Sequence, residues 1–171
     1  DKKYLRAMSM VGIEDGLIEL YLVAVEGGRT SPLLASLREG DRCYAEPKIT
    51  GHFTASHLPA EVGTDLWMIA TGTGIAPYIC MLRHSAEHLA RFERLVLVHT
   101  VRDVDYLTFG AELLQRAVES PRIRYIPVVT RSSRRLEVRD GHCALRSRVS
   151  QLLESGQLER AVTRLQKTEE Q

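Results

Sequence analysis

The sequence has few of the features that mark membrane, exported or nucleic-acid-binding proteins. Its longest apolar runs are only as long as a strand, and no signal-peptide pattern is present, so neither a membrane span nor export is indicated. The 23 basic and 22 acidic residues nearly cancel to a net charge of +1, which implies no bulk attraction to nucleic acid or to a membrane surface. We therefore expect a cytoplasmic protein that binds neither.

Cysteine is also scarce. Cys43, Cys80 and Cys143 are widely spaced and form no CxxC pair, which favours a reducing compartment and argues against a metal site. His52 and His57 have no cysteine or acidic cluster near them in the sequence, so a surface loop accounts for them better than a zinc site does. We expect no metal, and we expect Cys80 to be a buried structural cysteine rather than a reactive thiol.

The first sixty residues have the pattern of β structure. Residues 18–25 form a β-rich run that follows the turn signal Asp15-Gly16, and residues 4–10 supply a partner strand, which predicts an antiparallel hairpin. Three further segments are expected before the pattern changes: a short helix at residues 33–37, a strand at 41–46 and a loop at 48–59.

Strands and helices alternate after a boundary near residues 59–64. The strands are expected at residues 66–70, 95–99 and 124–129, and the helices at 78–92 and 106–119. Continuous apolar strands separated by helices predict a parallel sheet that is covered on both faces. Beyond them we expect a polar, basic loop at 132–148, a short helix at 149–153 and a helical segment at 158–171.

A glycine turn separates the first of these strands from the helix that follows. Gly72 and Gly74 let backbone amides approach a ligand closely, and the next helix adds free N–H groups and the positive end of its dipole. The match to the dinucleotide fingerprint is partial, because Pro77 stands where a third glycine is usual. A phosphate-bearing cofactor is the natural ligand, and a turn without a ligand is the alternative.

Basic and hydroxyl side chains follow the second and third strands. Arg102 comes after the second strand and Thr130-Arg131 after the third, and both strands end at the same edge as the glycine turn. Guanidinium and hydroxyl groups suit the 2′-phosphate of NADP, whereas Asp103 would suit the ribose of NAD. The larger number of basic and hydroxyl side chains favours NADP over NAD. A solvated basic loop is the alternative for Arg134 and Arg135.

Four short motifs occur in one order along the chain: Arg6-Ala7-Met8-Ser9, Gly28-Arg29-Thr30-Ser31, Thr71 to Pro77, and Val129-Thr130-Arg131. In this combination the chain resembles the bacterial branch of the ferredoxin–NADP reductase family. The resemblance implies an antiparallel β-barrel that holds FAD, followed by a parallel α/β domain that holds NADP(H). Here it implies a partial flavin-binding barrel at residues 1–61 and an NADP-binding domain, without its last strand, at 62–171.

The resemblance also implies roles for individual residues. Arg6 would contact the FAD pyrophosphate, and Ser9 would lie near flavin N5, the atom that exchanges hydride, which makes Ser9 the catalytic candidate. Met8 stands where the family has an aromatic residue against the flavin ring. The other implied cofactor-binding residues are Gly28 and Ser31 for FAD, Thr71, Gly72, Thr73, Gly74 and Pro77 for the NADP pyrophosphate and nicotinamide, and Thr130 and Arg131, with Arg102 nearby, for the 2′-phosphate.

The function implied is FAD-dependent electron transfer between NADP(H) and a one-electron carrier, ferredoxin or flavodoxin. One alternative is the reductase component of an oxygenase or of another flavin electron-transfer chain. The alternative from another class is a non-catalytic NADP(H)-binding sensor or regulatory subunit. Because the resemblance covers only the middle of the family's two-domain unit and the chain begins at Asp1, we expect a longer protein or a partner that completes the fold.

Overall fold

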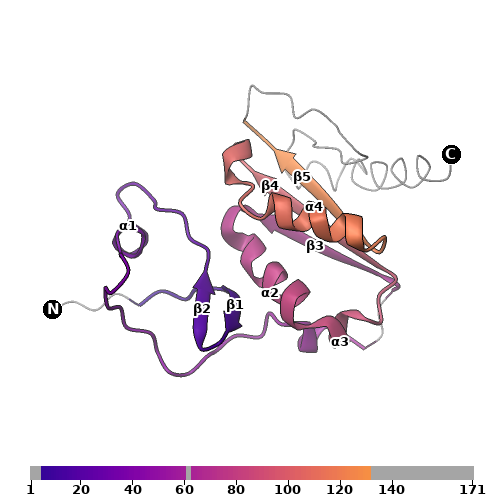
Figure 1. Cartoon of the computed structure of the whole chain (residues 1–171), viewed down its shortest axis with the longest axis horizontal. Helices are drawn as coiled ribbons and strands as arrows, with labels where there is room; N and C mark the ends of the chain where they lie inside the picture. The colour runs from indigo at the N-terminus through magenta and orange to yellow at the C-terminus, as the bar shows by residue number, and fades with distance from the viewer. Residues whose placement is uncertain (1–4, 61–62, 132–171) are drawn as a thin grey trace. The chain divides into compact units, whose positions relative to one another are not determined.

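The computed structural model describes residues 5–60 and 63–131, which belong to two compact units (Figure 1). The first unit comprises Asp1–Val62 and Ala76–Arg91, and the second comprises Gly63–Ile75 and Phe92–Gln171. The expected loop at 132–148 and the expected helices at 149–153 and 158–171 lie outside the described residues. The functional boundary between residues 61 and 62 stays a prediction.

A tight β-hairpin opens the first unit. β1 (Met10–Glu14) pairs antiparallel with β2 (Leu17–Leu20), and the strands meet at Glu14 opposite Leu17. The two loop residues, Asp15 and Gly16, have φ of 50° and 78°, as a type I′ turn requires. The hairpin and its turn are confirmed, but the second strand ends at Leu20, so the strand expected to continue to residue 25 is shorter than predicted. The prediction of a partner strand at residues 4–10 is wrong. The partner is β1 at residues 10–14, because a two-residue loop requires the first strand to end at Glu14.

The remaining elements of the first unit are short. They are α1 (Ser31–Ala35), the 3₁₀ turn η1 (Ala55–His57), α2 (Ala76–His84) and α3 (Ala86–Leu89). The prediction of a single helix at 78–92 is wrong. This segment forms two helices, α2 and α3, because Ser85 between them takes a non-helical conformation with φ −126° and ψ 34°. The strand expected at 41–46 is absent from the described chain. A strand needs a neighbour for its backbone groups, and among the described residues the sheet of this unit contains only β1 and β2.

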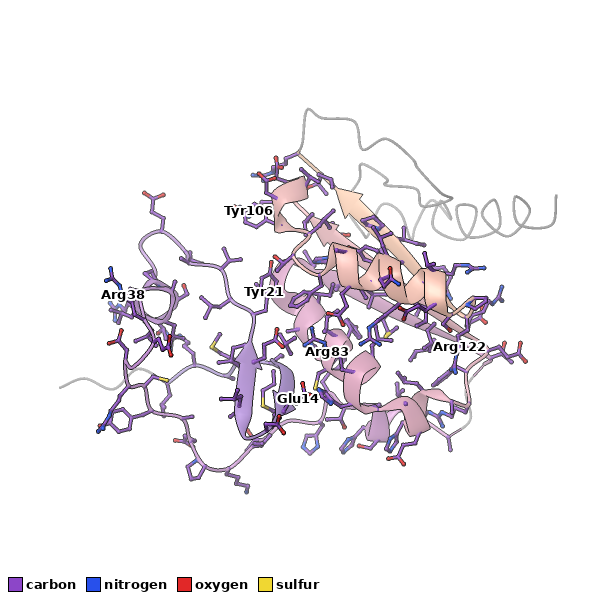
Figure 2. All side chains as sticks on the ribbon, in the orientation of Figure 1. Glu14, Tyr21, Arg38, Arg83, Tyr106 and Arg122 are labelled. Carbon is purple, nitrogen blue, oxygen red and sulfur yellow. The ribbon has the colours of Figure 1, made fainter. Side chains whose placement is uncertain are left out.

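The hairpin packs against α2. Val11 on β1 is fully buried, and the next residue, Gly12, brings the strand so close that an added Cβ would lie 3.0 Å from His84 Nε2. Arg83, labelled on α2 in Figure 2, forms an ion pair with Glu19 of β2 at 2.6 Å. The burial of Val11, the close approach at Gly12 and the ion pair between Arg83 and Glu19 therefore join the hairpin to this helix.

The second unit is built on a parallel sheet in the order β3-β4-β5. Its strands are β3 (Asp65–Thr71), β4 (Arg94–Val101) and β5 (Ile123–Val129), and its helical segments are η2 (Gly72–Ile75), η3 (Val104–Tyr106) and α4 (Gly110–Glu119). All three strands agree with the prediction. The helix expected at 106–119 begins later, at Gly110. An antiparallel sheet followed by a parallel sheet confirms the predicted fold class.

The central strand β4 is buried along almost its whole length. Only Arg94, its first residue, is partly exposed, which accounts for the continuous apolar run in the sequence. The buried cluster on one face consists of Val96, Val98, Ile126 and Val128, with Trp67 packed against it. Helix α4 packs along β5 and contributes Leu113, which is fully buried. The core therefore fixes the positions at which the three strands end.

Polar contacts hold the amino-terminal edge of this sheet. Arg94 pairs with Asp65 at 2.6 Å, and Arg122, labelled in Figure 2, donates a hydrogen bond to the carbonyl oxygen of Phe92 at 2.8 Å. The Arg94–Asp65 ion pair and the Arg122 hydrogen bond thus link the starts of neighbouring strands. In the part of the chain that the structure describes, no helix is both long and apolar enough to cross a bilayer.

Candidate cofactor-binding site

The glycine turn continues directly from the carboxyl end of β3. Thr71 is the last residue of the strand, and Gly72 begins η2 with φ of +53°, a left-handed conformation that suits glycine. A Cβ added to Gly72 or Gly74 would meet no described atom within 4 Å. The backbone of the turn is therefore open to a ligand. The first N–H groups of η2 have no partner within that helix, so they suit a phosphate group.

Pro77 follows the turn as the second residue of α2, which the structure groups with the first unit. Its ring fixes a helical φ at a position where a backbone N–H would have no partner in the helix. The sequence therefore predicts its structural role correctly. A contact between Pro77 and nicotinamide stays a prediction.

The pairing of β4 with β5 extends one step beyond the sheet and brings two arginines together. The N–H of Thr130 donates to the carbonyl oxygen of Val101 at 2.9 Å, and the N–H of Arg131 donates to that of Arg102 at 2.8 Å. Both arginine side chains are exposed, and neither forms an ion pair or a side-chain hydrogen bond with residues 5–60 or 63–131. The sequence-predicted pair thus shares one edge with the glycine turn, where parallel sheets bind ligands.

Thr100 is a polar residue at this edge that the sequence analysis missed. It is 5% exposed and lies beside Thr71 in the register of β3 and β4. Its Oγ1 is buried without a hydrogen-bond partner among the described residues. A buried hydroxyl normally has a partner, so this oxygen is suited to a bound group. A threonine one residue before the end of a largely apolar strand was the available signal.

His99 is the second residue that sequence reasoning missed. It is fully buried on β4, with Nε2 3.0 Å from the carbonyl oxygen of Gly72 and Nδ1 3.5 Å from the hydroxyl of Tyr125. Burial lowers the pKa of His99 below its ordinary value, although the Gly72 carbonyl opposes this. For Tyr125, whose charged form is an anion, burial raises the pKa of the hydroxyl. Both side chains are therefore neutral at pH 7.

The candidate flavin residues of the first motif lie before β1 and are exposed. Among the described residues, Arg6 donates one hydrogen bond, at 2.8 Å, to the carbonyl oxygen of its neighbour Leu5. A guanidinium has five N–H donors, so Arg6 retains donors for an anion. Met8 is 36% exposed and offers an apolar contact beside the hydroxyl of Ser9. These groups fit a pyrophosphate-bearing flavin chemically, and their roles stay predictions.

Gly28 and Ser31 shape a turn in the first unit. The N–H of Gly28 bonds the carbonyl oxygen of Val25 at 2.8 Å, and Gly27, with φ of +71°, makes this turn possible. A Cβ on Gly28 would lie 2.8 Å from the same oxygen, so only glycine fits there. Ser31 Oγ accepts the Val25 N–H at 3.1 Å. Both residues are structurally engaged, and any flavin contact would be additional.

The remaining candidates have structural explanations. Cys80 is half-buried on α2, and burial raises the pKa of its thiol, although Arg83 opposes this, so it is a poor nucleophile at neutral pH. His57 Nδ1 lies 2.8 Å from Thr54 Oγ1 within the η1 turn, and its ring packs edge-on against His52 with centroids 5.2 Å apart. These contacts are consistent with the loop interpretation of the two histidines.

The carboxyl edge of the second unit combines an open glycine turn, a buried hydroxyl that has no partner among the described residues, and two exposed arginines. A parallel α/β sheet with this edge defines a nucleotide-binding domain. Residues 68–162 match the model of the oxidoreductase NAD-binding domain, and the chain belongs to that family.

Similar proteins agree with the resemblance seen in the sequence. The chain is 40% identical over 161 residues to the flavodoxin/ferredoxin–NADP reductase of Shigella flexneri and 38% identical over 161 residues to that of Escherichia coli (strain K12). Each match covers 92% of this chain and 60% of the relative. The chain thus spans about 60% of the length of these relatives. The predicted resemblance to ferredoxin–NADP reductases is confirmed.

Solved structures give the same result for the fold. A ferredoxin NADP⁺ reductase from Neisseria gonorrhoeae with bound FAD and NADP matches with a TM-score of 0.78 at 30% identity, covering 92% of this chain and 60% of that one. A cytochrome P450 reductase from Amycolatopsis matches with a TM-score of 0.62 at 22% identity, covering 94% of this chain and 51% of that one. The second likeness concerns the fold alone.

Proposed function

We propose that this chain is part of an FAD-dependent reductase that transfers electrons between NADP(H) and ferredoxin or flavodoxin. The observation that carries the proposal is the carboxyl edge of the second unit, where the open Gly72 and Gly74 backbone shares one sheet edge with the paired Arg102 and Arg131. The names of the relatives support the choice of electron carrier. The solved reductase with bound FAD and NADP supports the choice of cofactors.

In this proposal residues 62–171 bind NADP(H). The backbone amides of Thr71, Gly72, Thr73 and Gly74 bind the pyrophosphate, because glycines leave room for close approach. Arg131 and Arg102 bind the 2′-phosphate through charge-assisted hydrogen bonds. The hydroxyl of Thr130, which donates to the carbonyl oxygen of Val101 at 3.3 Å, joins them by turning its proton toward the phosphate. Pro77 borders the nicotinamide.

Residues 1–61 bind FAD in the same proposal. Arg6 pairs with the flavin pyrophosphate, and the turn shaped by Gly28 and Ser31 lies along it. Met8 packs against the ring system, where its polarizable sulfur replaces an aromatic face. Ser9 offers a hydroxyl near N5 and is the proposed catalytic residue.

The cofactors supply the chemistry when bound: nicotinamide and flavin exchange hydride, and flavin passes electrons on one at a time. The protein's part is to bind and orient them. No acid or base residue is required for a hydride step, so the proposal needs no catalytic dyad or triad. We further propose that the protein acts in the cytoplasm.

The proposal is tested on the intact gene product. A purified protein that carries FAD near one equivalent and reduces an artificial acceptor with NADPH supports it. A folded protein that binds NADPH and takes up no FAD would instead favour a regulatory NADP(H)-binding subunit. A folded protein that binds neither would end the proposal.

A further inference from the structure

His99 connects the interior of the sheet to the glycine turn. Its Nε2 lies 3.0 Å from the carbonyl oxygen of Gly72, and a carbonyl can only accept a hydrogen bond, so Nε2 carries the hydrogen. In the neutral imidazole Nδ1 is then an acceptor, and it faces the hydroxyl of Tyr125 at 3.5 Å. The Tyr125 hydroxyl therefore donates to His99 Nδ1, and His99 Nε2–H donates to the carbonyl oxygen of Gly72.

This contact fixes the orientation of the peptide between Gly72 and Thr73. The described chain has no cis peptide bond, and in a trans peptide the C=O and the N–H point in opposite directions. The Gly72 carbonyl is directed at a fully buried histidine, so the Thr73 N–H is directed away from it. Gly72 has a left-handed backbone conformation, and without a contact to its carbonyl a glycine could adopt other backbone conformations of similar energy. A hydrogen bond to its carbonyl removes those alternatives.

We propose that His99 is a positioning residue for cofactor binding: it holds the Gly72–Thr73 peptide so that the Thr73 N–H is presented to an anionic group of the nicotinamide dinucleotide. Tyr125 supports this role because its hydroxyl selects the tautomer in which Nε2 is the donor. The inference rests on the proposed NADP(H) function of the glycine turn. It adds a residue that touches no cofactor and acts through the backbone.

A core histidine with only a packing role is the competing explanation. Two substitutions distinguish the explanations, because the amide nitrogen of glutamine occupies a place similar to Nε2 and leucine offers no donor. His99→Gln keeps the hydrogen bond to Gly72, and His99→Leu removes it. Val96→Ala is the matched control, since Val96 is equally buried in the same strand but lies on the opposite face of β4.

The experiment is a calorimetric titration of the full chain with NADP⁺. We expect His99→Leu to bind about 10-fold more weakly, His99→Gln to stay within about 3-fold of wild type, and Tyr125→Phe to lose about 3-fold, from the net value of one hydrogen bond. Val96→Ala is expected to lower the unfolding temperature and leave the dissociation constant unchanged. Equal binding by His99→Leu and wild type, or equal losses in both His99 variants, would overturn the role.

If His99→Leu does not fold, a measurement on the wild-type chain tests the same role of His99. Nuclear magnetic resonance of the wild-type chain should show His99 as the Nε2–H tautomer, and NADP⁺ should shift the Thr73 amide resonance. The same shift is expected in His99→Gln. A wild-type protein that binds NADP⁺ without perturbing the Thr73 amide would overturn the positioning role alone. A folded wild-type protein that does not bind NADP⁺ would overturn the proposed function and this role together.

Discussion

The backbone N–H of Arg131 donates to the carbonyl oxygen of Arg102 at 2.8 Å, so the two arginines leave the sheet side by side. Two exposed cations on neighbouring strands repel each other, and a doubly charged anion between them removes that repulsion. A phosphate monoester suits this arrangement, because each guanidinium can form two parallel hydrogen bonds with it.

Substitution of either arginine should therefore distinguish NADPH from NADH. We expect Arg131→Ala and Arg102→Ala each to weaken NADPH binding about 10-fold or more, from the loss of one charge-assisted contact, with NADH binding little changed. The control for the loss of one positive charge is Arg94→Ala at the opposite end of the sheet, and its unfolding temperature is measured as well because this variant also loses the ion pair with Asp65. Fluorescence titration with both nucleotides measures the effect. Equal losses for NADPH and NADH would contradict a 2′-phosphate role.

The two glycines of the turn should respond differently to alanine. Gly74→Ala places a methyl group in open space at an unstrained backbone position, so we expect unchanged stability and weaker NADP⁺ binding. Gly72→Ala forces an L-residue to φ of +53°, which costs about 1–2 kcal/mol of stability as well. Urea unfolding and nucleotide titration separate the two effects. Unchanged affinity in Gly74→Ala would show that no ligand approaches that backbone.

The lowered pKa of His99 predicts a pH dependence of stability. Below about pH 6.5 the unfolded chain protonates this imidazole while the native protein keeps it neutral, so the free energy of unfolding falls as pH decreases toward the native pKa. The loss from one group cannot exceed about 1.4 kcal/mol per pH unit. Tyr125, the ionisable group that faces His99, has a raised pKa and stays protonated throughout this range.

His99→Gln provides the comparison for that measurement. The two proteins differ only at residue 99, so the difference between their losses of stability isolates the contribution of His99. Urea unfolding at pH 7.5 and pH 5.5 should show a smaller loss in His99→Gln than in wild type. Identical losses would mean that His99 is not held neutral in the native protein.

The close contact between β1 and α2 predicts a coupled pair. A methyl group on Gly12 would lie 3.0 Å from His84 Nε2, the tip of an exposed side chain, so we expect the stabilisation that alanine gives over glycine to be reduced or cancelled in Gly12→Ala. In a His84→Ala background the same change should be neutral or stabilising, because alanine reduces the freedom of the unfolded chain. A double-mutant cycle by urea unfolding measures the difference. Equal effects in both backgrounds would show that the two residues do not constrain each other.

The parallel sheet was predictable because β4 and β5 are buried runs of strand length with helices between them. Arg102, Thr130 and Arg131 could be assigned to one edge for the same reason, since parallel strands place their carboxyl ends together. The hairpin was predictable from Asp15-Gly16, whose left-handed conformations suit a type I′ turn. Local signals were sufficient wherever one short segment decided the structure.

The wrong or missing predictions concern residues whose structure depends on a neighbour that the local sequence does not reveal. Residues 41–46 have strand-like composition but no strand beside them in the described chain. The break at Ser85 interrupts a segment that reads as one helix. His99 is the clearest case, because its partners Gly72 and Tyr125 lie 27 and 26 residues away along the chain and become adjacent only in the folded sheet.

The central claim is that NADP(H) and FAD act together in this protein, and anaerobic reduction tests it most directly. The intact gene product, purified with its flavin, is mixed with one equivalent of NADPH while the flavin absorbance is followed. We predict that NADPH bleaches the flavin absorbance and that the same concentration of NADH does so much more slowly. A flavin that stays oxidised in the presence of NADPH, in a folded protein that binds the nucleotide, would contradict the account.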